Sequence, residues 1–190
     1  FPIILRLFSN KIIINITGLG RTFNTKSFTR TIVGVLYKLN FNLAEKIIFQ
    51  TTYDMDFFRN NHNHYKYTTV PGSGLNITNN FFPTINTFRK IVFVGRLLKS
   101  KGIHDFLEIA KIMLDENNNL EFYIAGLYDK SDPDYIDYKV LENYLSNDKI
   151  VYLGFVTDID NLLQTTDITV LPSTYMEGIP FSLIQAAGNS

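Results

Sequence analysis

The second half of this chain alternates strand-like and helix-like segments, and this alternation is the strongest constraint on its fold. Buried strands are indicated by four short apolar segments, at 91–95, 120–125, 149–153 and 167–171. Helical spacing of apolar residues follows each of them, at about 102–116, 134–146, 158–165 and from 181 onward. Strands that alternate with helices form a parallel sheet with right-handed crossovers. We therefore predict an α/β fold built on a Rossmann-like parallel sheet with helices on both faces.

The turn after the first of these strands carries two cations. Residues 91–102 read IVFVGRLLKSKG, in which Gly95 ends the strand and Gly102 leads into the helix. In an open α/β sheet, ligands bind beyond the carboxyl ends of the strands, where helix N-termini offer unpaired N–H groups to anions. Arg96 and Lys101 therefore form a candidate site for a phosphate or diphosphate. The alternative is that both are solvated turn residues.

A second candidate stretch, PSTYMEGIPFSLIQAAG, follows the last strand. Pro180 suits the first turn of a helix. The N–H groups at that helix entry, of Gly178, Ile179 and Phe181, are predicted to face an anion. A carboxylate would repel the anion, so Glu177 is expected to accept hydrogen bonds from hydroxyl groups, unless it is only a solvated loop charge. Cations for phosphate and a carboxylate for hydroxyls together favour a nucleotide sugar as the ligand.

The first half is predicted to belong to a separate domain, because charge changes sharply between the halves. Residues 1–90 carry 11 Lys and Arg against 3 Asp and Glu, a net charge of +8, and residues 91–190 carry 7 against 15, a net charge of −8. A basic half is attracted to an anionic membrane or to nucleic acid, unless its charge is merely solvated. The breaker cluster PGSG at 71–74 ends the last strand expected before a poorly periodic stretch.

We therefore divide the chain into part of an N-terminal domain at 1–71, a linker at 72–90 and part of a C-terminal domain at 91–190. Within the N-terminal half, regular elements are expected as strands at 11–15, 46–50 and 67–70 and as helices at 27–39 and 51–60.

Several kinds of site are excluded or disfavoured. The chain has no cysteine, which excludes disulfides and thiolate metal sites. No GxGxxG follows a strand and no Walker A sequence occurs, which argues against dinucleotide and P-loop sites. Two Asp-x-Asp spacings, at 132–134 and 158–160, are interpreted as acids at helix entries rather than as metal ligands. His62 and His64 are interpreted as solvated loop residues. No apolar run reaches the roughly 20 residues that span a bilayer.

Residues 91–188 resemble the donor-binding domain of retaining glycosyltransferases of family 4, which have the two-domain GT-B fold. The resemblance rests on five sequence segments that occur in the same order as in the family: VGRLLKSKG (94–102), LEFYIAG (120–126), IVYLGFVTDIDNLL (150–163), DITVLPS (167–173) and EGIPFSLIQAAG (177–188). In the first half, INITGLGRTF, IIFQTTYDMDFF and VPGSGLN resemble the end of the N-terminal domain in a subgroup that builds bacterial surface polysaccharides on lipid carriers. The chain is therefore expected to be a GT-B fragment, incomplete at both ends.

The resemblance implies roles for individual residues. Arg96 and Lys101 match the pair that binds the donor diphosphate and stabilises the leaving nucleotide. Glu177 matches the first glutamate of a Glu, seven residues, Glu motif and would contact the donor-sugar hydroxyls. These three are the expected catalytic residues. Phe155 and Val156 fall where the family's backbone meets the nucleobase. The expected donor-binding residues in full are Gly95, Phe155, Val156, Gly178, Ile179, Pro180, Phe181 and Gln185.

Two positions depart from the family pattern. Gln185 stands where the family has its second glutamate, which binds the ribose, so a neutral amide would make a weaker hydrogen bond there. Thr17 stands where many relatives carry a histidine, so no catalytic base is assigned.

The leading prediction is a retaining glycosyltransferase, or a fragment of one, that moves a sugar from a nucleotide donor to a lipid-linked saccharide in lipopolysaccharide or capsule biosynthesis. The subgroup suggests UDP as the nucleotide, and no metal, other cofactor or nucleic-acid partner is expected. The basic half is expected to face the anionic inner leaflet, which implies a cytoplasmic enzyme that is peripheral on the plasma membrane.

The alternatives are a non-catalytic remnant that at most binds nucleotide sugar, and a Rossmann-like interaction module without a ligand. A parallel sheet that ends after its fourth donor-domain strand leaves an edge uncovered. The isolated chain is therefore expected to be prone to aggregation.

Overall fold

The computed structural model describes residues 11–20, 23, 28–59, 66–76, 88–174 and 177–189. The chain divides into two compact units. The N-terminal unit comprises Phe1–Gly74 and Tyr175–Phe181, and the C-terminal unit comprises Leu75–Thr174 and Ser182–Ser190. Most of the linker predicted at 72–90 lies outside the described residues.

The C-terminal unit is built on a four-stranded parallel sheet in the order β6-β5-β4-β7. Its strands are β4 (Lys90–Val94), β5 (Glu121–Ala125), β6 (Ile150–Gly154) and β7 (Ile168–Thr169). The intervening helices are α4 (Ile103–Glu116), α5 (Tyr138–Leu145) and α6 (Ile159–Gln164), and α7 (Phe181–Gly188) follows β7. Strand β4 is an inner strand that is apolar and buried from Ile91 to Val94, as expected for a strand that is covered on both faces.

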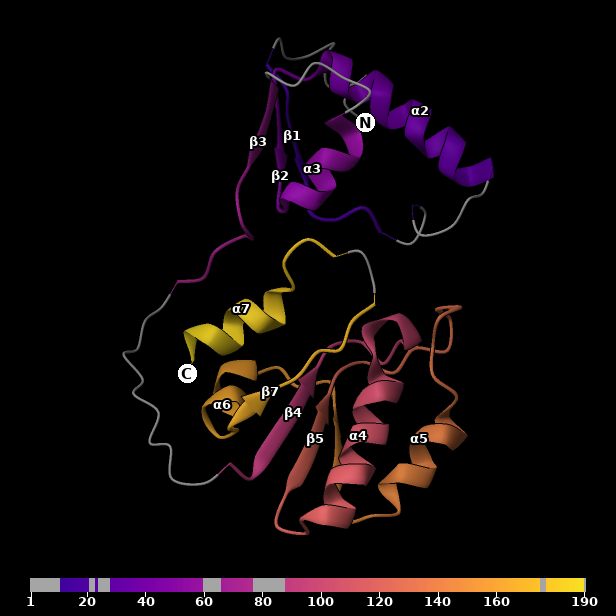
Figure 1. Ribbon diagram of the computed structural model, residues 1–190, viewed down its shortest axis with the longest axis vertical. Coiled ribbons are helices and arrows are strands. Elements are labelled where there is room, and N and C mark those ends of the chain that lie inside the picture. Colours follow the sequence, from indigo (N-terminus) through magenta and orange to yellow (C-terminus); the bar gives the residue numbers. More distant parts are fainter. Residues whose placement is uncertain are drawn as a thin grey trace. The chain divides into compact units, whose positions relative to one another are not determined.

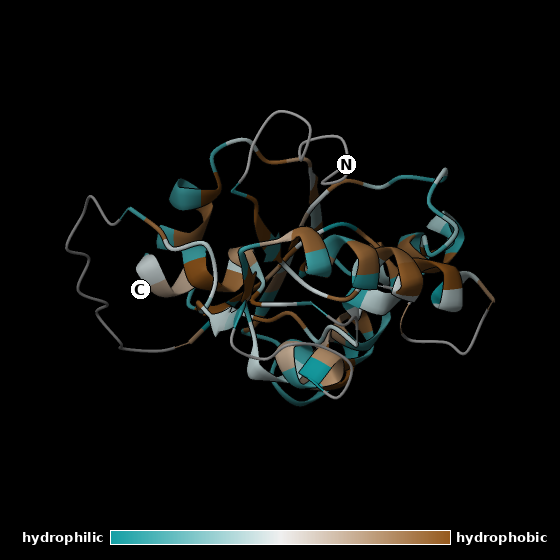
Figure 2. Cartoon of the chain, turned by 90° about the horizontal axis from the view of Figure 1, so that it is seen from above, coloured by the Kyte–Doolittle hydropathy of each residue, from teal (hydrophilic) through white to brown (hydrophobic). Residues whose placement is uncertain are grey.

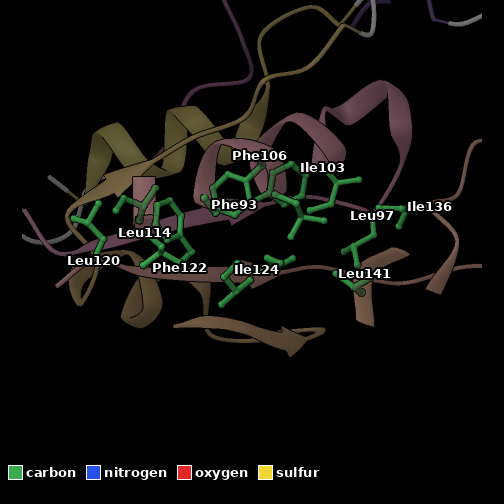
Figure 3. Packing of buried hydrophobic residues seen from close by; sticks show 14 residues of the cluster. Phe93, Leu97, Ile103, Phe106, Leu114, Leu120, Phe122, Ile124, Ile136 and Leu141 are labelled. Atoms are coloured by element: carbon green, nitrogen blue, oxygen red, sulfur yellow. The ribbon is translucent and has the colours of Figure 1, made fainter. Parts of the chain in front are cut away.

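Side chains of β4 alternate between two hydrophobic layers. Ile91 and Phe93 join a core with α4 and α5, in which Phe93 packs on Phe106 and Phe106 on Phe122 (Figure 3). Val92 and Val94 face the opposite layer, with side chains from α6 and α7. Helices therefore cover both faces of the sheet (Figure 1), and the predicted α/β fold is confirmed.

Two elements of the C-terminal unit differ from their predicted bounds by more than one residue. The helix expected at 134–146 begins at Tyr138, because the Asp137 side chain accepts the Lys139 N–H at 3.0 Å and caps that end. The strand expected at 167–171 is shortened to two residues, Ile168 and Thr169, which pair with β4, although the flanking Asp167 and Val170 N–H groups still donate to β4 carbonyls at 2.9 Å.

The N-terminal unit contains a three-stranded parallel sheet in the order β1-β2-β3. The strands are β1 (Ile13–Ile16), β2 (Lys46–Phe49) and β3 (Tyr67–Thr69), and the helices are α2 (Phe28–Leu43) and α3 (Thr52–Arg59). One aromatic-rich core joins both helices to one face of the sheet, with Phe41, Phe49 and Phe58 in mutual contact. The elements predicted in this half are confirmed, with ends that shift by a few residues.

Helix α2 is apolar on the side away from this core as well. A stripe at helical spacing is exposed to solvent: Phe28, Ile32, Val35, Leu36 and Leu39. Hydrophobic colour accordingly runs along α2 (Figure 2). The helix contains no acidic residue, and Lys38 is its exposed cation. Within the described part of the chain, no helix is long and apolar enough to cross a bilayer.

Candidate functional site

The carboxyl edge of the C-terminal sheet is closely packed at its backbone. The Gly95 N–H donates to the Ala125 carbonyl at 2.9 Å, which continues the pairing of β4 and β5 past their ends. At Gly126 a Cβ would lie 1.8 Å from the Gly95 carbonyl oxygen, so only glycine fits there. This close approach holds the first residues after β4 against the first residues after β5.

The turn that follows Gly95 is anchored by two leucines. Leu97 and Leu98 are buried, while Arg96, between Gly95 and these leucines, has a side chain that is 53% exposed. The Leu97 N–H donates to the Leu127 carbonyl at 3.1 Å, and the Leu97 carbonyl accepts the Ile136 N–H at 3.3 Å. The backbone next to Arg96 is therefore fixed by the loop between β5 and α5.

Arg96 itself forms an ion pair with a carboxylate from that loop. Its Nη1 lies 3.2 Å from Oδ2 of Asp132, whose side chain is only 10% exposed. The other oxygen of Asp132 accepts the Asp134 N–H at 3.0 Å, which orients the carboxylate. A guanidinium has five N–H donors, so one bond to Asp132 restrains Arg96 and leaves capacity to bind an anion.

Lys101 lies on the short 3-10 turn η3 (Lys99–Lys101), which is held from two directions. On one side the Asp134 carboxylate accepts the Ser100 N–H at 3.1 Å and the Ser100 hydroxyl, and the Asp134 carbonyl accepts the Lys99 N–H at 2.8 Å. On the other side the Ser100 carbonyl accepts the Thr174 N–H at 2.9 Å.

Gly102 ends the turn and precedes α4. Its φ of 77° lies in the left-handed region, and a Cβ would meet the Pro172 carbonyl oxygen at 2.0 Å. Gly102 therefore allows the segment after β7 to lie directly on the turn. Both cations predicted from the sequence are thus carried by one rigid turn beyond the end of β4.

The interpretation of Asp132 and Asp134 as helix-entry acids is wrong. Helix α5 starts at Tyr138 with Asp137 as its cap, and the two earlier carboxylates bind the turn 96–101 instead. Nearby, hydrogen bonds from the Ser131 hydroxyl and N–H hold the pKa of Asp129 below its ordinary value. The density of carboxylates at 129–137 was the available signal, but their partners could not be read from it.

Phe155 and Val156 follow β6 at the same edge of the sheet. Phe155 is 72% exposed, so its ring is not part of the core. Val156 packs against the layer that includes Ala125 and Leu163. An exposed aromatic ring and a fixed backbone are compatible with a nucleobase contact, and this role stays a prediction.

Gln185 on α7 has a carboxylate partner on α6. Its Nε2 donates to Oδ1 of Asp160 on α6 at 2.9 Å, and the Asn189 amide donates to the same oxygen at 2.8 Å. A glutamate at this position would bring a second negative charge to Asp160. The Gln185 side chain therefore joins α6 and α7.

The described residues 177–181 belong to the N-terminal unit, where they bind the ends of β1 and β2. The Gly178 N–H donates to the Thr17 carbonyl at 3.1 Å, and the Ile179 N–H donates to Oε1 of Gln50 at 3.2 Å. A Cβ at Gly178 would lie 2.3 Å from that Gln50 oxygen. These two N–H groups, predicted to face an anion, have protein acceptors in this structure. Glu177 is half-buried.

The structure therefore assigns the predicted residues to two groups. The C-terminal unit holds Gly95, Arg96, Lys101, Phe155 and Val156 beyond the strand ends, with Gln185 on α7. Glu177, Gly178, Ile179, Pro180 and Phe181 are grouped with the N-terminal unit. Sequence reasoning missed Asp132, Asp134 and Ser100 in the first group and Gln50 in the second.

Metal ligands do not gather in the part of the chain that the structure describes. No three His, Asp or Glu side chains there lie close enough to hold an ion. His62 and His64 lie outside the described residues.

Comparison with known proteins identifies relatives. Residues 78–189 match the family described as glycosyl transferases group 1. The chain is 31% identical over 191 aligned positions to the N,N'-diacetylbacillosaminyl-diphospho-undecaprenol alpha-1,3-N-acetylgalactosaminyltransferase of Campylobacter jejuni, a match that covers 90% of this chain and 48% of that protein. It is 30% identical over 97 residues to the capsular polysaccharide biosynthesis glycosyltransferase CapM of Staphylococcus aureus, covering 50% of this chain and 24% of that protein.

Solved structures share the fold. Anabaena Alr3699/HepE in complex with UDP superposes with a TM-score of 0.79 at 16% identity, covering 99% of this chain and 54% of that one. TarM superposes with a TM-score of 0.71 at 21% identity, covering 94% of this chain and 35% of that one. This chain spans about half the length of the Campylobacter relative and about a quarter of CapM.

Proposed function

Because the chain belongs to the glycosyl transferases group 1 family, we propose that its C-terminal unit carries the donor diphosphate site of a retaining glycosyltransferase, with Arg96 and Lys101 as the phosphate-binding cations. The observation that carries this proposal is the rigid turn beyond β4 that bears both cations. Ligands of open α/β sheets bind at this edge.

The two cations would act on the leaving group. As the bond between the sugar and the donor breaks, negative charge grows on the β-phosphate of the nucleotide. Cations that are already held in place lower the barrier, because they need no reorganisation when that charge appears. The planar guanidinium of Arg96 suits two phosphate oxygens at once, whereas the Lys101 ammonium acts as a point charge.

The remaining predicted residues would recognise the rest of the donor. Glu177 would accept hydrogen bonds from sugar hydroxyls, Gln185 would bind the ribose, and the backbone at Phe155 and Val156 would meet the nucleobase. The reaction needs no metal in this proposal, since the cations neutralise the diphosphate. We propose UDP as the nucleotide; it is the nucleotide bound in Alr3699/HepE, a structure of the same fold.

We further propose a lipid-linked saccharide as the acceptor. The name of the Campylobacter relative specifies a diphospho-undecaprenol substrate, and that of CapM specifies capsular polysaccharide biosynthesis. An acceptor of this kind resides in a membrane, so the enzyme would work at the cytoplasmic membrane surface.

Helix α2 is the surface that suits an anionic bilayer. Its exposed apolar stripe is flanked by the exposed Lys38, α2 has no acidic residue, and the first 90 residues carry a net charge of +8. Helices that combine an apolar stripe with basic residues bind anionic lipid surfaces.

Calorimetric titration of the chain with UDP tests the donor site. We expect binding at about millimolar affinity or tighter, with a loss of about tenfold or more in Arg96→Ala and in Lys101→Ala, because each removes a charge-assisted hydrogen bond. Lys99→Ala is the matched control, since Lys99 is exposed on the same turn. Absence of binding to UDP, GDP and UDP-sugars would favour the ligand-free module. Binding without sugar transfer would favour the non-catalytic remnant.

Vesicle flotation tests the membrane surface. The chain should float with vesicles that contain anionic lipid, and Leu36→Glu should abolish flotation. Ile112→Glu, on the exposed side of α4, is the matched control and should float as the unmodified chain does. If Leu36→Glu floats as the unmodified chain does, α2 does not bind the bilayer. If Leu36→Glu instead dissociates a dimer in sedimentation, a second copy covers the stripe.

A further inference from the structure

The loop between β5 and α5 holds the turn that carries Lys101, and one carboxylate of this loop accepts two hydrogen bonds from Ser100. Asp134 Oδ2 accepts both the N–H and the hydroxyl of Ser100, and the backbone carbonyl of Asp134 accepts the Lys99 N–H. Ser100 directly precedes Lys101, so these contacts fix the backbone from which the Lys101 side chain extends.

The turn has few internal contacts of its own, and its other side-chain hydrogen bonds come from the Ser173 and Thr174 hydroxyls to the Ser100 carbonyl. A 3-10 turn of three residues contributes few internal hydrogen bonds, and η3 has no side-chain cap from Leu98, the residue at its N-cap position. Asp134 supplies that missing acceptor from 34 positions farther along the chain. A carboxylate that receives two donors is a stronger acceptor than a neutral group.

We propose that Asp134 is a positioning residue of the diphosphate site, which acts by holding the Ser100 backbone and hydroxyl so that the Lys101 ammonium is placed before the donor binds. This inference rests on the proposed function of Lys101. Asp134 does not touch the donor in this scheme. It reduces the conformational freedom that Lys101 would otherwise lose on binding, which is how preorganisation raises affinity.

The other aspartates of the loop have different hydrogen-bond partners from Asp134. Asp132 forms an ion pair with Arg96, Asp129 binds Ser131, and Asp137 caps α5. Asp137 thus shares the loop, the charge and a backbone-capping role with Asp134, but it has no contact with the cation-bearing turn among its described hydrogen bonds.

A set of UDP titrations on the chain tests the proposal. Asp134→Ala should weaken UDP binding by about tenfold, because a misplaced charge loses much of its effect. Asp134→Asn should restore affinity to within about threefold of the unmodified chain, since an amide oxygen can accept the Ser100 N–H. Asp137→Ala is the matched control, with a lower melting temperature expected from the lost cap and an unchanged UDP affinity.

A double-mutant cycle tests whether Asp134 acts on UDP affinity through Lys101. In a Lys101→Ala background, Asp134→Ala should cause no further loss of affinity, whereas independent effects would add. Equal UDP affinity of Asp134→Ala and the unmodified chain overturns the inference while the proposed function stands. Additive losses in the cycle, or a loss that Asp134→Asn fails to restore, overturn it as well. If the unmodified chain binds no nucleotide, the proposed function fails and this inference falls with it.

Discussion

The two units use the same kind of parallel sheet but bury it differently. In the C-terminal unit, side chains of β4 alternate into two cores, one with α4 and α5 and the other with α6 and α7. In the N-terminal unit, one core joins α2 and α3 to a single face, and Ile13 on the other face is exposed among the described residues.

This difference shows that apolar character does not by itself specify burial. Helices α2 and α4 both carry apolar residues at helical spacing. Helix α4 buries five of them and exposes Ile109, Ile112 and Met113, whereas α2 buries Phe41 and exposes a stripe of five. A helix that is apolar on two sides needs two partners, and the described residues provide one of them. The C-terminal unit should therefore depend on internal packing, and α2 should tolerate changes on its outward side.

Phe93→Ala should have the largest effect on stability, because Phe93 is fully buried and contacts Phe106 between the sheet and α4. We expect a loss of about 3–5 kcal/mol in the free energy of unfolding, from lost transfer energy and a cavity. Urea denaturation measures it. Phe155→Ala removes an equal ring from an exposed position and should change stability by less than about 0.5 kcal/mol. Similar losses in both variants would contradict the packing seen around β4.

Gln185→Glu should be the next largest change. It replaces the amide that donates to Asp160 with a carboxylate, so a hydrogen bond is lost and two negative charges meet between α6 and α7. The expected loss is about 1–2 kcal/mol at neutral pH, measured by thermal or urea unfolding. Adding Asp160→Asn should recover most of it. If the Gln185→Glu variant is as stable as the unmodified chain, the contact with Asp160 does not persist in solution.

Gly34→Ala examines the backbone of α2, with a smaller effect. No described atom lies within 4 Å of a Cβ at this helical glycine. Alanine should therefore raise the stability by about 0.5–1 kcal/mol, since it removes the entropy cost of a helical glycine. Gly126→Ala in the other unit should strongly destabilise, because its Cβ would collide with the Gly95 carbonyl. Destabilisation by Gly34→Ala would indicate that another surface packs on α2.

Asp54 gives the N-terminal unit a pH dependence of its own. Burial raises its pKa, against a lesser opposing effect of a hydrogen bond with Thr51, and its Oδ2 has no hydrogen-bond partner among the described residues. Because the folded-state pKa lies above the unfolded one, stability falls as the pH rises from the unfolded-state value through the folded-state value. Asp54→Asn should remove this decline. Urea denaturation of the unmodified chain and of Asp54→Asn measures this decline at about pH 3.5, near the ordinary carboxyl pKa, and at about pH 7, well above it.

Much of the C-terminal unit could be predicted from the sequence, because its signals are local. Apolar runs of four or five residues followed by glycine marked β4, β5 and β6, and periodicity marked α4. The start of α5 and the length of β7 could not be predicted in this way. The helix is expected to begin at 134, but Asp134 binds Ser100, and Asp137 caps α5 instead. Similarly, nothing local indicates that the strand at 167–171 is reduced to Ile168 and Thr169.

The sequence by itself determined the alternation of strands and helices, the turn with Arg96 and Lys101, and the charge difference between the halves. Local patterns carry all three. Tertiary structure alone decided what each charged group touches. Asp132 meets Arg96 from 36 positions away and Asp134 meets Ser100 from 34, because β4 and β5 lie side by side and end at the same edge of the sheet. Gln185 meets Asp160 because α6 and α7 pack on one face. Such pairs depend on strand order and helix placement, which residue spacing along the chain does not encode.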